Sequence, residues 1–94
     1  MSGQIMKIFE WDENKRTINL EKHGIDFINA VGIFGDVNRI ELETIRNGES
    51  RVISIGRVYD IILLVVYVHR QEKKRLISAR RASAEERECY ESNS

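Results

Sequence analysis

The sequence contains no proline, a single cysteine and only two histidines among its 94 residues. One cysteine cannot form an internal disulfide, and the lack of a disulfide framework is typical of a reducing cytosol. Without proline, the turns must be formed by glycine, asparagine and aspartate. The two histidines lie far apart, which does not give the ligand spacing of a metal site. A glycine-rich phosphate loop and a serine nucleophile motif are also missing, which argues against nucleotide-cofactor chemistry and serine hydrolysis.

No excess of charge of either sign is present, because fifteen basic residues balance fifteen acidic ones. A nucleic-acid-binding role must therefore come from a local basic patch. Such a patch extends over residues 69–81, where Glu72 is the one acidic residue among six basic ones: Arg70, Lys73, Lys74, Arg75, Arg80 and Arg81. For Lys73 and Lys74 we favour a solvated hairpin tip.

Long hydrophobic runs are absent too. The longest apolar run, residues 61–68, is far too short to span a bilayer and is typical of a buried strand. The N-terminus has no basic region followed by a long apolar stretch, so we expect no signal peptide and no contact with a membrane. We expect a single domain over residues 1–94, with its folded part at 7–91. Residues 1–6 we expect to be disordered, or in part added before a natural start at Met6.

Local signals predict the order of the helices and strands. A short strand at 7–11 precedes a helix from the N-cap Asp12 to about His23, which Gly24 ends. Asp26 caps a second, apolar helix that ends at residues 35–36. Four strands follow, with the Asn-Gly pair at 47–48 as the strongest hairpin signal. The strands are expected at 37–45, 51–58, 61–70 and 75–80, and a last helix at 84–91.

Consecutive strands joined by short turns form an antiparallel sheet. The expected fold class is therefore α+β: a strand, two helices, a four-stranded antiparallel run and a C-terminal helix, with the helices on one face of the sheet. Cys89 lies in the last predicted helix, where we expect it to be a small core residue.

The segment 76–83 carries the clearest functional signal. An apolar strand runs directly into Arg80 and Arg81, and Ser83 and Glu86 follow in the spacing of a capping box. Guanidinium groups bind phosphate in a bidentate manner, and a helix N-terminus favours anions. This rim is therefore suited to a nucleic-acid backbone, although Arg80 could instead bind Glu85 or Glu88.

Other polar side chains lack an obvious structural need. On the first helix, Lys15, Asn19 and Lys22 follow i, i+4, i+7 spacing, although a solvated surface helix is the alternative. Metal-free RNA cleavage needs a base, an acid and cations that stabilise the pentavalent phosphorane. The further candidates for these tasks are His23, Arg51, Arg57 and Tyr90.

Each of these candidates also has a structural interpretation. His23 could stabilise the C-terminus of its helix, and Arg51 could pair with an acidic residue across the hairpin. Tyr90 could pack against the sheet, and from the residue pattern alone we favour this packing role over an acid role. His69 we favour as a structural histidine, and Trp11 as a core residue rather than a platform for a base.

Three segments resemble the BrnT family of bacterial toxins: FEWDENKRTINLEKHGIDFINAVGIF, RVISIGRV and LISARRASAEERECYE. The resemblance covers residues 8–91 and carries the motifs W-D-x-x-K, K-H-G, I-G-R and I-S-A-R in this order. It implies a type II toxin with a fold like the RelE ribonucleases, which cleaves RNA without a cofactor and arrests translation. It also implies a BrnA-like antitoxin that blocks the toxin and binds DNA, so that DNA is contacted only through the antitoxin. A dimer of toxin–antitoxin heterodimers is compatible with such a system.

The matching positions suggest roles by resemblance. The motif positions in this chain are Lys15, Asn19, Lys22, His23, Arg51, Gly56, Arg80, Glu86 and Tyr90. The position after Arg80 is usually lysine, and Arg81 keeps the charge but is a poorer proton donor. Our hypothesis assigns catalysis to His23, Arg51, Arg80 and Tyr90, with both arginines beside one scissile phosphate. It assigns RNA binding to Lys15, Asn19, Lys22, Arg57 and Arg81. The alternative is a non-enzymatic co-repressor or partner-binding module, or an inactive toxin.

Overall fold

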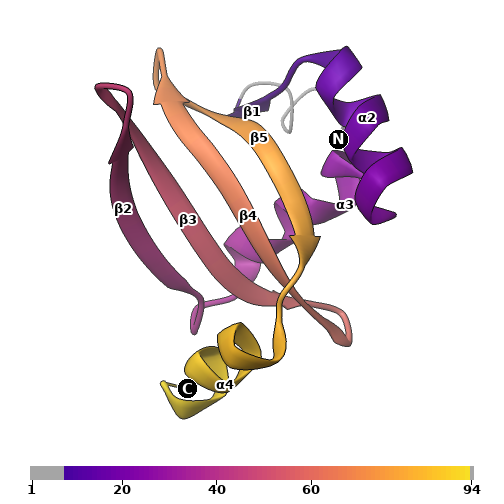
Figure 1. The fold of residues 1–94 in the computed structure, drawn as a ribbon, viewed down its shortest axis with the longest axis vertical. Coiled ribbons are helices and arrows are strands. Elements are labelled where there is room, and N and C mark those ends of the chain that lie inside the picture. The colour runs from indigo at the N-terminus through magenta and orange to yellow at the C-terminus, as the bar shows by residue number, and fades with distance from the viewer. Residues whose placement is uncertain (1–7, 94) are drawn as a thin grey trace.

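A five-stranded mixed sheet forms the centre of the computed structural model, which describes residues 8–93 (Figure 1). The strand order in the sheet is β1-β5-β4-β3-β2. The elements are β1 (Phe9–Glu10), α2 (Glu13–His23), α3 (Phe27–Ala30), the 3-10 helix η1 (Val31–Gly35), β2 (Ile40–Arg46), β3 (Glu49–Val58), β4 (Ile61–Arg70), β5 (Lys73–Arg81) and α4 (Ala84–Ser92). The predicted α+β class and the order of the elements are confirmed. The predictions for residues 1–6 and for Lys7 lie outside the described residues.

Strands β2 to β5 form the expected antiparallel run, but β1 pairs with β5 in parallel. The predicted four-stranded antiparallel run is confirmed. The partner and direction of β1 were not predicted from the sequence, because no local turn joins β1 to its neighbour. The second strand begins at Ile40 rather than at residue 37. The side chain of Asp36 accepts a hydrogen bond from the Asn38 amide at 2.9 Å, which holds this segment in a turn and leaves Val37 91% exposed.

The helix boundaries follow the predicted caps. The Asp12 carboxylate accepts hydrogen bonds from the amides of Asn14 and Lys15, and Gly24 ends α2 with a φ of 73°. Asp26 caps α3 through the Ile28 amide. The second helix continues as the tighter η1, so its predicted end at residues 35–36 is also confirmed.

Helix α3 and the helix η1 cover one face of the sheet, and α2 lies along its β5 edge (Figure 1). Phe27, Ala30 and Ile33 are fully buried there against Val65 and Ala79 of the sheet. The Trp11 indole packs edge-to-face on Phe27 with the ring centroids 6.0 Å apart, as expected for a core residue. The removal of this apolar surface from water is the main stabilising contribution on this side.

Helix α4 packs against the opposite face, so the expectation that all helices share one face is wrong. Ile62 and Leu64, which alternate with the residues of the first core, form a second cluster with Tyr90 of α4. The Ala82 amide donates a hydrogen bond of 2.9 Å to the Ile62 carbonyl, which holds the end of β5 beside β4. The chain then passes from β5 into α4 at the strand ends (Figure 1). Cys89 is exposed, and the prediction that it is a core residue is wrong, because its neighbour Tyr90 occupies the buried side of α4.

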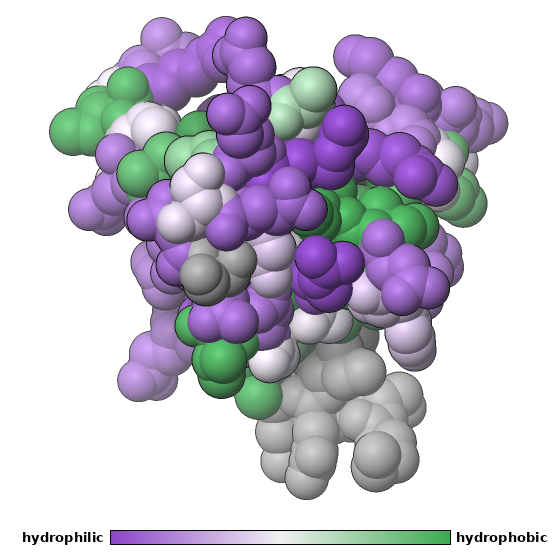
Figure 2. All heavy atoms as spheres, turned by 90° about the horizontal axis from the view of Figure 1, so that it is seen from below, coloured by the Kyte–Doolittle hydropathy of each residue, from purple (hydrophilic) through white to green (hydrophobic). Residues whose placement is uncertain are grey.

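No helix within residues 8–93 combines the length and the apolar character needed to cross a bilayer. The Figure 2 view, which looks onto the end of the molecule that carries α4, shows mainly hydrophilic side chains with separate hydrophobic patches.

Gly56, the glycine of the I-G-R motif, is buried where η1 and the turn at residues 36–39 meet β3. A Cβ atom there would lie 2.7 Å from Cγ1 of Ile33 and 3.0 Å from Cβ of Arg39. We predict that Gly56→Ala lowers the free energy of unfolding by about 1–3 kcal/mol, because overpacking forces these neighbours to move. Urea unfolding measures the change. Gly35→Ala is the matched control, since a Cβ there meets nothing within 4 Å. Equal stability of the two variants would contradict this account.

Candidate nucleic-acid interface

Asn19 joins α2 to the edge of the sheet. Its side-chain amide donates to the carbonyls of Ala79 at 2.7 Å and Ile25 at 2.9 Å, and its oxygen accepts from the Ala79 amide at 3.1 Å. The carboxamide thus satisfies both backbone groups of Ala79, as a neighbouring strand would. Because Asn19 is only 6% exposed, we remove it from the RNA-binding residues and assign it a structural role.

The polar face of α2 consequently lies beside the sheet. Lys15 and His23 are one helical turn on either side of Asn19 and share its face. Together with Lys22 and Ile77 of β5, they line a hollow of about 220 Å³. The solvated-helix alternative holds for Lys15 and Lys22, which are exposed, but not for Asn19, the one buried residue of α2. Of the apolar residues of α2, Ile18 is 59% exposed and lines the same hollow, and Leu20 is 43% exposed.

A second hollow of about 340 Å³ adjoins the first, because Lys15 and Ile77 line both. Arg51 of β3 and Arg75 of β5 also line it. We call the two hollows together the cationic groove. Its basic residues are Lys15, Lys22, His23, Arg51, His69, Arg70 and Arg75. Of the predicted site residues, the structure thus brings together Lys15, Lys22, His23 and Arg51.

Two arginines of the groove have acidic partners. Arg51 pairs with Glu49 at 3.3 Å on its own strand, not across the hairpin, and the Glu49 side chain is 58% exposed. Arg75 pairs with Glu10 of β1 at 3.1 Å. Lys15, Lys22 and Arg70 form no ion pair with any residue in the range 8–93. An exposed pair contributes little free energy, so an RNA phosphate can compete with Glu49 for Arg51.

Arg70 and Arg75 are residues of the groove that the hypothesis missed. Their place beside Arg51 depends on the strand register, which pairs Val68 with Arg75 and Val52 with Tyr67. No local sequence signal contains that register. His69 borders the groove as well, but its ring packs edge-to-face on Tyr67 with centroids 5.4 Å apart, in keeping with a structural role.

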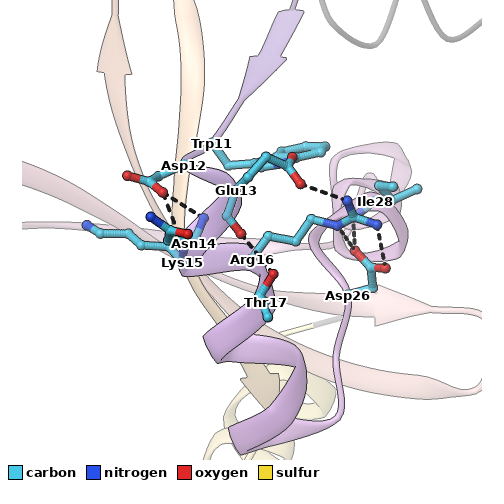
Figure 3. A network of polar contacts seen from close by, with 9 residues as sticks. All are labelled: Trp11, Asp12, Glu13, Asn14, Lys15, Arg16, Thr17, Asp26 and Ile28. Carbon is cyan, nitrogen blue, oxygen red and sulfur yellow. Dashed lines mark hydrogen bonds and ion pairs between the residues drawn. The ribbon is translucent and has the colours of Figure 1, made fainter.

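An ion-pair network fixes the orientation of α2 (Figure 3). Arg16 binds Asp26 through two hydrogen bonds of 2.8 and 3.1 Å and binds Glu13 at 3.0 Å. The Arg16 guanidinium lowers the pKa of Asp26, so this carboxylate stays charged. Lys15 extends in the opposite direction, away from the network. The Trp11 indole donates to Glu13 at 2.7 Å.

Arg80 does not face the same hollow as Arg51. Both lie on the α4 side of the sheet, but the register places Arg80 in line with Leu64 and Ile55. Ile55 is four residues further along β3 than Arg51, which is about 13 Å. Arg51 and Arg80 thus share one face of the sheet, but Arg80 lines neither hollow of the groove, and the expectation that the two guanidinium groups flank one phosphate stays a prediction.

The Arg80 guanidinium instead binds Glu86 of α4 in a bidentate manner, at 2.8 and 3.0 Å. Glu86 also accepts from the Ser83 amide at 2.8 Å, and Ser83 accepts from the Glu86 amide, which completes the predicted capping box. The partner is thus neither Glu85 nor Glu88. The hydrogen bonds from Arg80 lower the pKa of Glu86 to about 2.

Tyr90 lies at the far end of the open face and is only 4% exposed. Its hydroxyl donates to Asp36 at 2.5 Å, and the same carboxylate oxygen accepts from the Arg57 amide at 2.8 Å. The bond to Asp36 raises the pKa of Tyr90, which keeps the phenol neutral. Tyr90 therefore locks α4 against η1 and β3, away from the cationic groove. The other predicted binding residues, Arg57 and Arg81, line a separate hollow with Arg87.

The comparison with protein families decides the relationship of this chain. A family model described as "Ribonuclease toxin, BrnT, of type II toxin-antitoxin system" matches residues 11–86. The chain belongs to the BrnT family. The match includes all of α2, Arg51 and Arg80 and ends before Tyr90. A comparison with the curated proteins finds no match.

BrnT proteins are ribonuclease toxins of type II toxin–antitoxin systems, so membership implies an antitoxin partner. The membership that the sequence motifs suggested is confirmed. Within residues 8–93, no three side chains of histidine, cysteine, aspartate or glutamate are grouped so that they could hold a metal ion.

We predict that Asn19→Ala lowers the free energy of unfolding by about 3 kcal/mol, because several buried backbone groups of Ala79 and Ile25 lose their partner. Thermal or urea unfolding measures the effect. Asn14→Ala on the exposed side of α2 is the control and should change stability by less than about 0.5 kcal/mol. An equally small change for Asn19→Ala would show that the carboxamide does not hold α2 to β5.

The Arg80–Glu86 pair predicts a pH dependence of stability. The folded-state pKa of Glu86 is about 2, against 4.5 without the pair, so the stabilisation is complete above about pH 5 and is lost as the pH falls towards 2. Because the two side chains are 38% and 25% exposed, we expect a contribution of about 1 kcal/mol. The stability difference between the wild type and Glu86→Gln, measured by urea unfolding, should shrink over this pH interval. A difference that is constant with pH would contradict the assignment.

Proposed function

We propose that this chain is a metal-independent endoribonuclease that cleaves RNA in the cationic groove and thereby inhibits translation. The observation that carries the proposal is the shared hollow that joins Lys15 of α2 to Arg51 of β3, with His23 in the adjoining hollow. Family membership supplies the ribonuclease class. Because translation takes place in the cytoplasm, we place the activity there.

The groove offers the groups that such a reaction needs. Arg51 and Lys15 are positioned to bind the scissile phosphate and to stabilise the negative charge of the phosphorane. His23 lines the adjoining hollow, and we propose that it exchanges a proton with the attacking 2′-hydroxyl or the leaving oxygen of an RNA strand that lies along both hollows, because an imidazole can both accept and donate a proton. Lys22 extends the positive surface along α2 towards the flanking nucleotide.

This assignment removes two residues from the catalytic set of the first hypothesis. Arg80 uses both terminal nitrogens for Glu86, and the Tyr90 hydroxyl is bound to Asp36. We therefore give both residues the task of fixing α4 and propose no chemical step through them.

We further propose that the implied partner is a BrnA-like antitoxin that neutralises the toxin and carries the DNA-binding function. Two toxin–antitoxin heterodimers would then assemble on the operator, with DNA contacted through the antitoxin. A purified complex of the two chains that still cleaves RNA at the rate of the free toxin would exclude this form of neutralisation.

Cleavage of RNA in excess EDTA tests the proposed enzyme. We predict that Arg51→Gln lowers the cleavage rate about 100-fold, because it removes one donor to the developing charge. Arg46→Gln is the matched control: Arg46 is an exposed arginine of the same hairpin and lines neither hollow of the groove.

Full activity of Arg51→Gln would overturn the proposed site, and loss of wild-type cleavage in EDTA would overturn metal independence. Tight binding without cleavage, with ribosomes present, would favour the co-repressor alternative instead.

A further inference from the structure

Arginines that form no ion pair within residues 8–93 gather at the end of the open face away from the groove; one of them, Arg57, lies over the Tyr90 ring at 6.0 Å from its centroid. Five of the ten arginines form ion pairs within residues 8–93: Arg16, Arg39, Arg51, Arg75 and Arg80. Among the other five, Arg57, Arg81 and Arg87 line one hollow of about 220 Å³. We call these three residues the arginine triad. All three are exposed.

Three different elements bring the triad together. Arg57 lies near the end of β3, Arg81 is the last residue of β5, and Arg87 belongs to α4. The register pairs Arg57 with Ile62, and the Ala82 amide donates a hydrogen bond to the Ile62 carbonyl. The end of β3 and the end of β5 therefore lie on either side of Ile62 in β4. Arg87 is positioned by a hydrogen bond of 3.3 Å to the Ala82 carbonyl.

The charges in this hollow do not balance internally. Asp60 and Glu91 also line it, so three guanidinium groups face two carboxylates. The lining therefore keeps one net positive charge, which an entering anion would balance. Guanidinium groups match the planar geometry of phosphate oxygens, and they are less strongly hydrated than ammonium groups. The hollow is thus suited to a phosphate group.

We propose that the arginine triad binds a backbone phosphate of single-stranded RNA at a distance from the cleaved bond. Arg57 lies six residues along β3 from Arg51, and both belong to the open face, so the two sites are about 20 Å apart. An RNA strand held in the groove reaches the triad by passing beside α4. The choice of RNA rests on the proposed function, whereas the phosphate site itself rests on the triad.

Binding to an uncleavable strand tests the site without requiring catalysis. The probe is a single-stranded 2′-O-methyl RNA long enough to span both sites, followed by fluorescence anisotropy over a range of salt concentrations. The triple variant Arg57→Gln, Arg81→Gln, Arg87→Gln should bind about tenfold more weakly. The slope of log K against log salt should become shallower by about 0.7 for each phosphate released. Arg46→Gln, the control, should bind as the wild type does.

Kinetics separate this proposal from the proposed function. With a long RNA, the triple variant should raise KM and leave kcat unchanged. With a dinucleotide, which cannot reach the triad, both constants should equal those of the wild type. Urea unfolding verifies that the variant is folded, and single Arg81→Gln replaces it if it is not.

Duplex DNA is the second probe in the same assay. Two results for the triple variant would overturn the proposal. One is an affinity and salt slope for the 2′-O-methyl strand equal to those of the wild type, and the other is a loss of affinity for duplex DNA but not for the RNA strand. A wild-type chain that cleaves no RNA but shows the predicted binding difference would contradict the enzyme and support the phosphate site.

Discussion

The carboxamide of Asn19 holds the architecture of the groove together. It binds both backbone groups of Ala79 at the edge of β5, where β1 is too short to continue the sheet. A helix normally turns its apolar side towards the sheet, but here a polar stripe faces it. Because Asn19 is anchored, Lys15 on the same stripe is brought beside Arg51 and Arg75 of the sheet, and His23 lies in the adjoining hollow. The buried hydrogen bonds of Asn19 thus determine where the charged side chains of α2 lie relative to the sheet.

The arginines divide into two classes by their partners. Arg16 and Arg80 bind carboxylates in a bidentate manner and fasten α2 and α4, respectively, so their charge is used within the fold. The arginine triad and Arg70 have no such partner within residues 8–93. A chain without net charge therefore presents two separate positive surfaces, one at each end of the open face. This separation is the reason that a protein with balanced charge can bind a polyanion.

The sequence predicted the features that depend on neighbouring residues. Asp12, Gly24 and Asp26 act within one helical turn, and the capping box of Ser83 and Glu86 does the same, so these boundaries were correct. The parallel direction of β1 and the face chosen by α4 depend on contacts between distant segments, and local patterns do not contain them. The same holds for the site. Sequence spacing found the stripe of α2, but the separation of Arg51 from Arg80 follows from the strand register alone.

The most direct test of the central claim is an NMR titration of the isotopically labelled chain with a single-stranded 2′-O-methyl RNA. If the groove binds the strand beside the cleaved bond, the largest shift changes will fall on Lys15, Lys22 and His23 of α2 and on Arg51 and Ile77 of the sheet. Changes confined to β2 and α3, with the signals of α2 and Arg51 unmoved, would contradict the account.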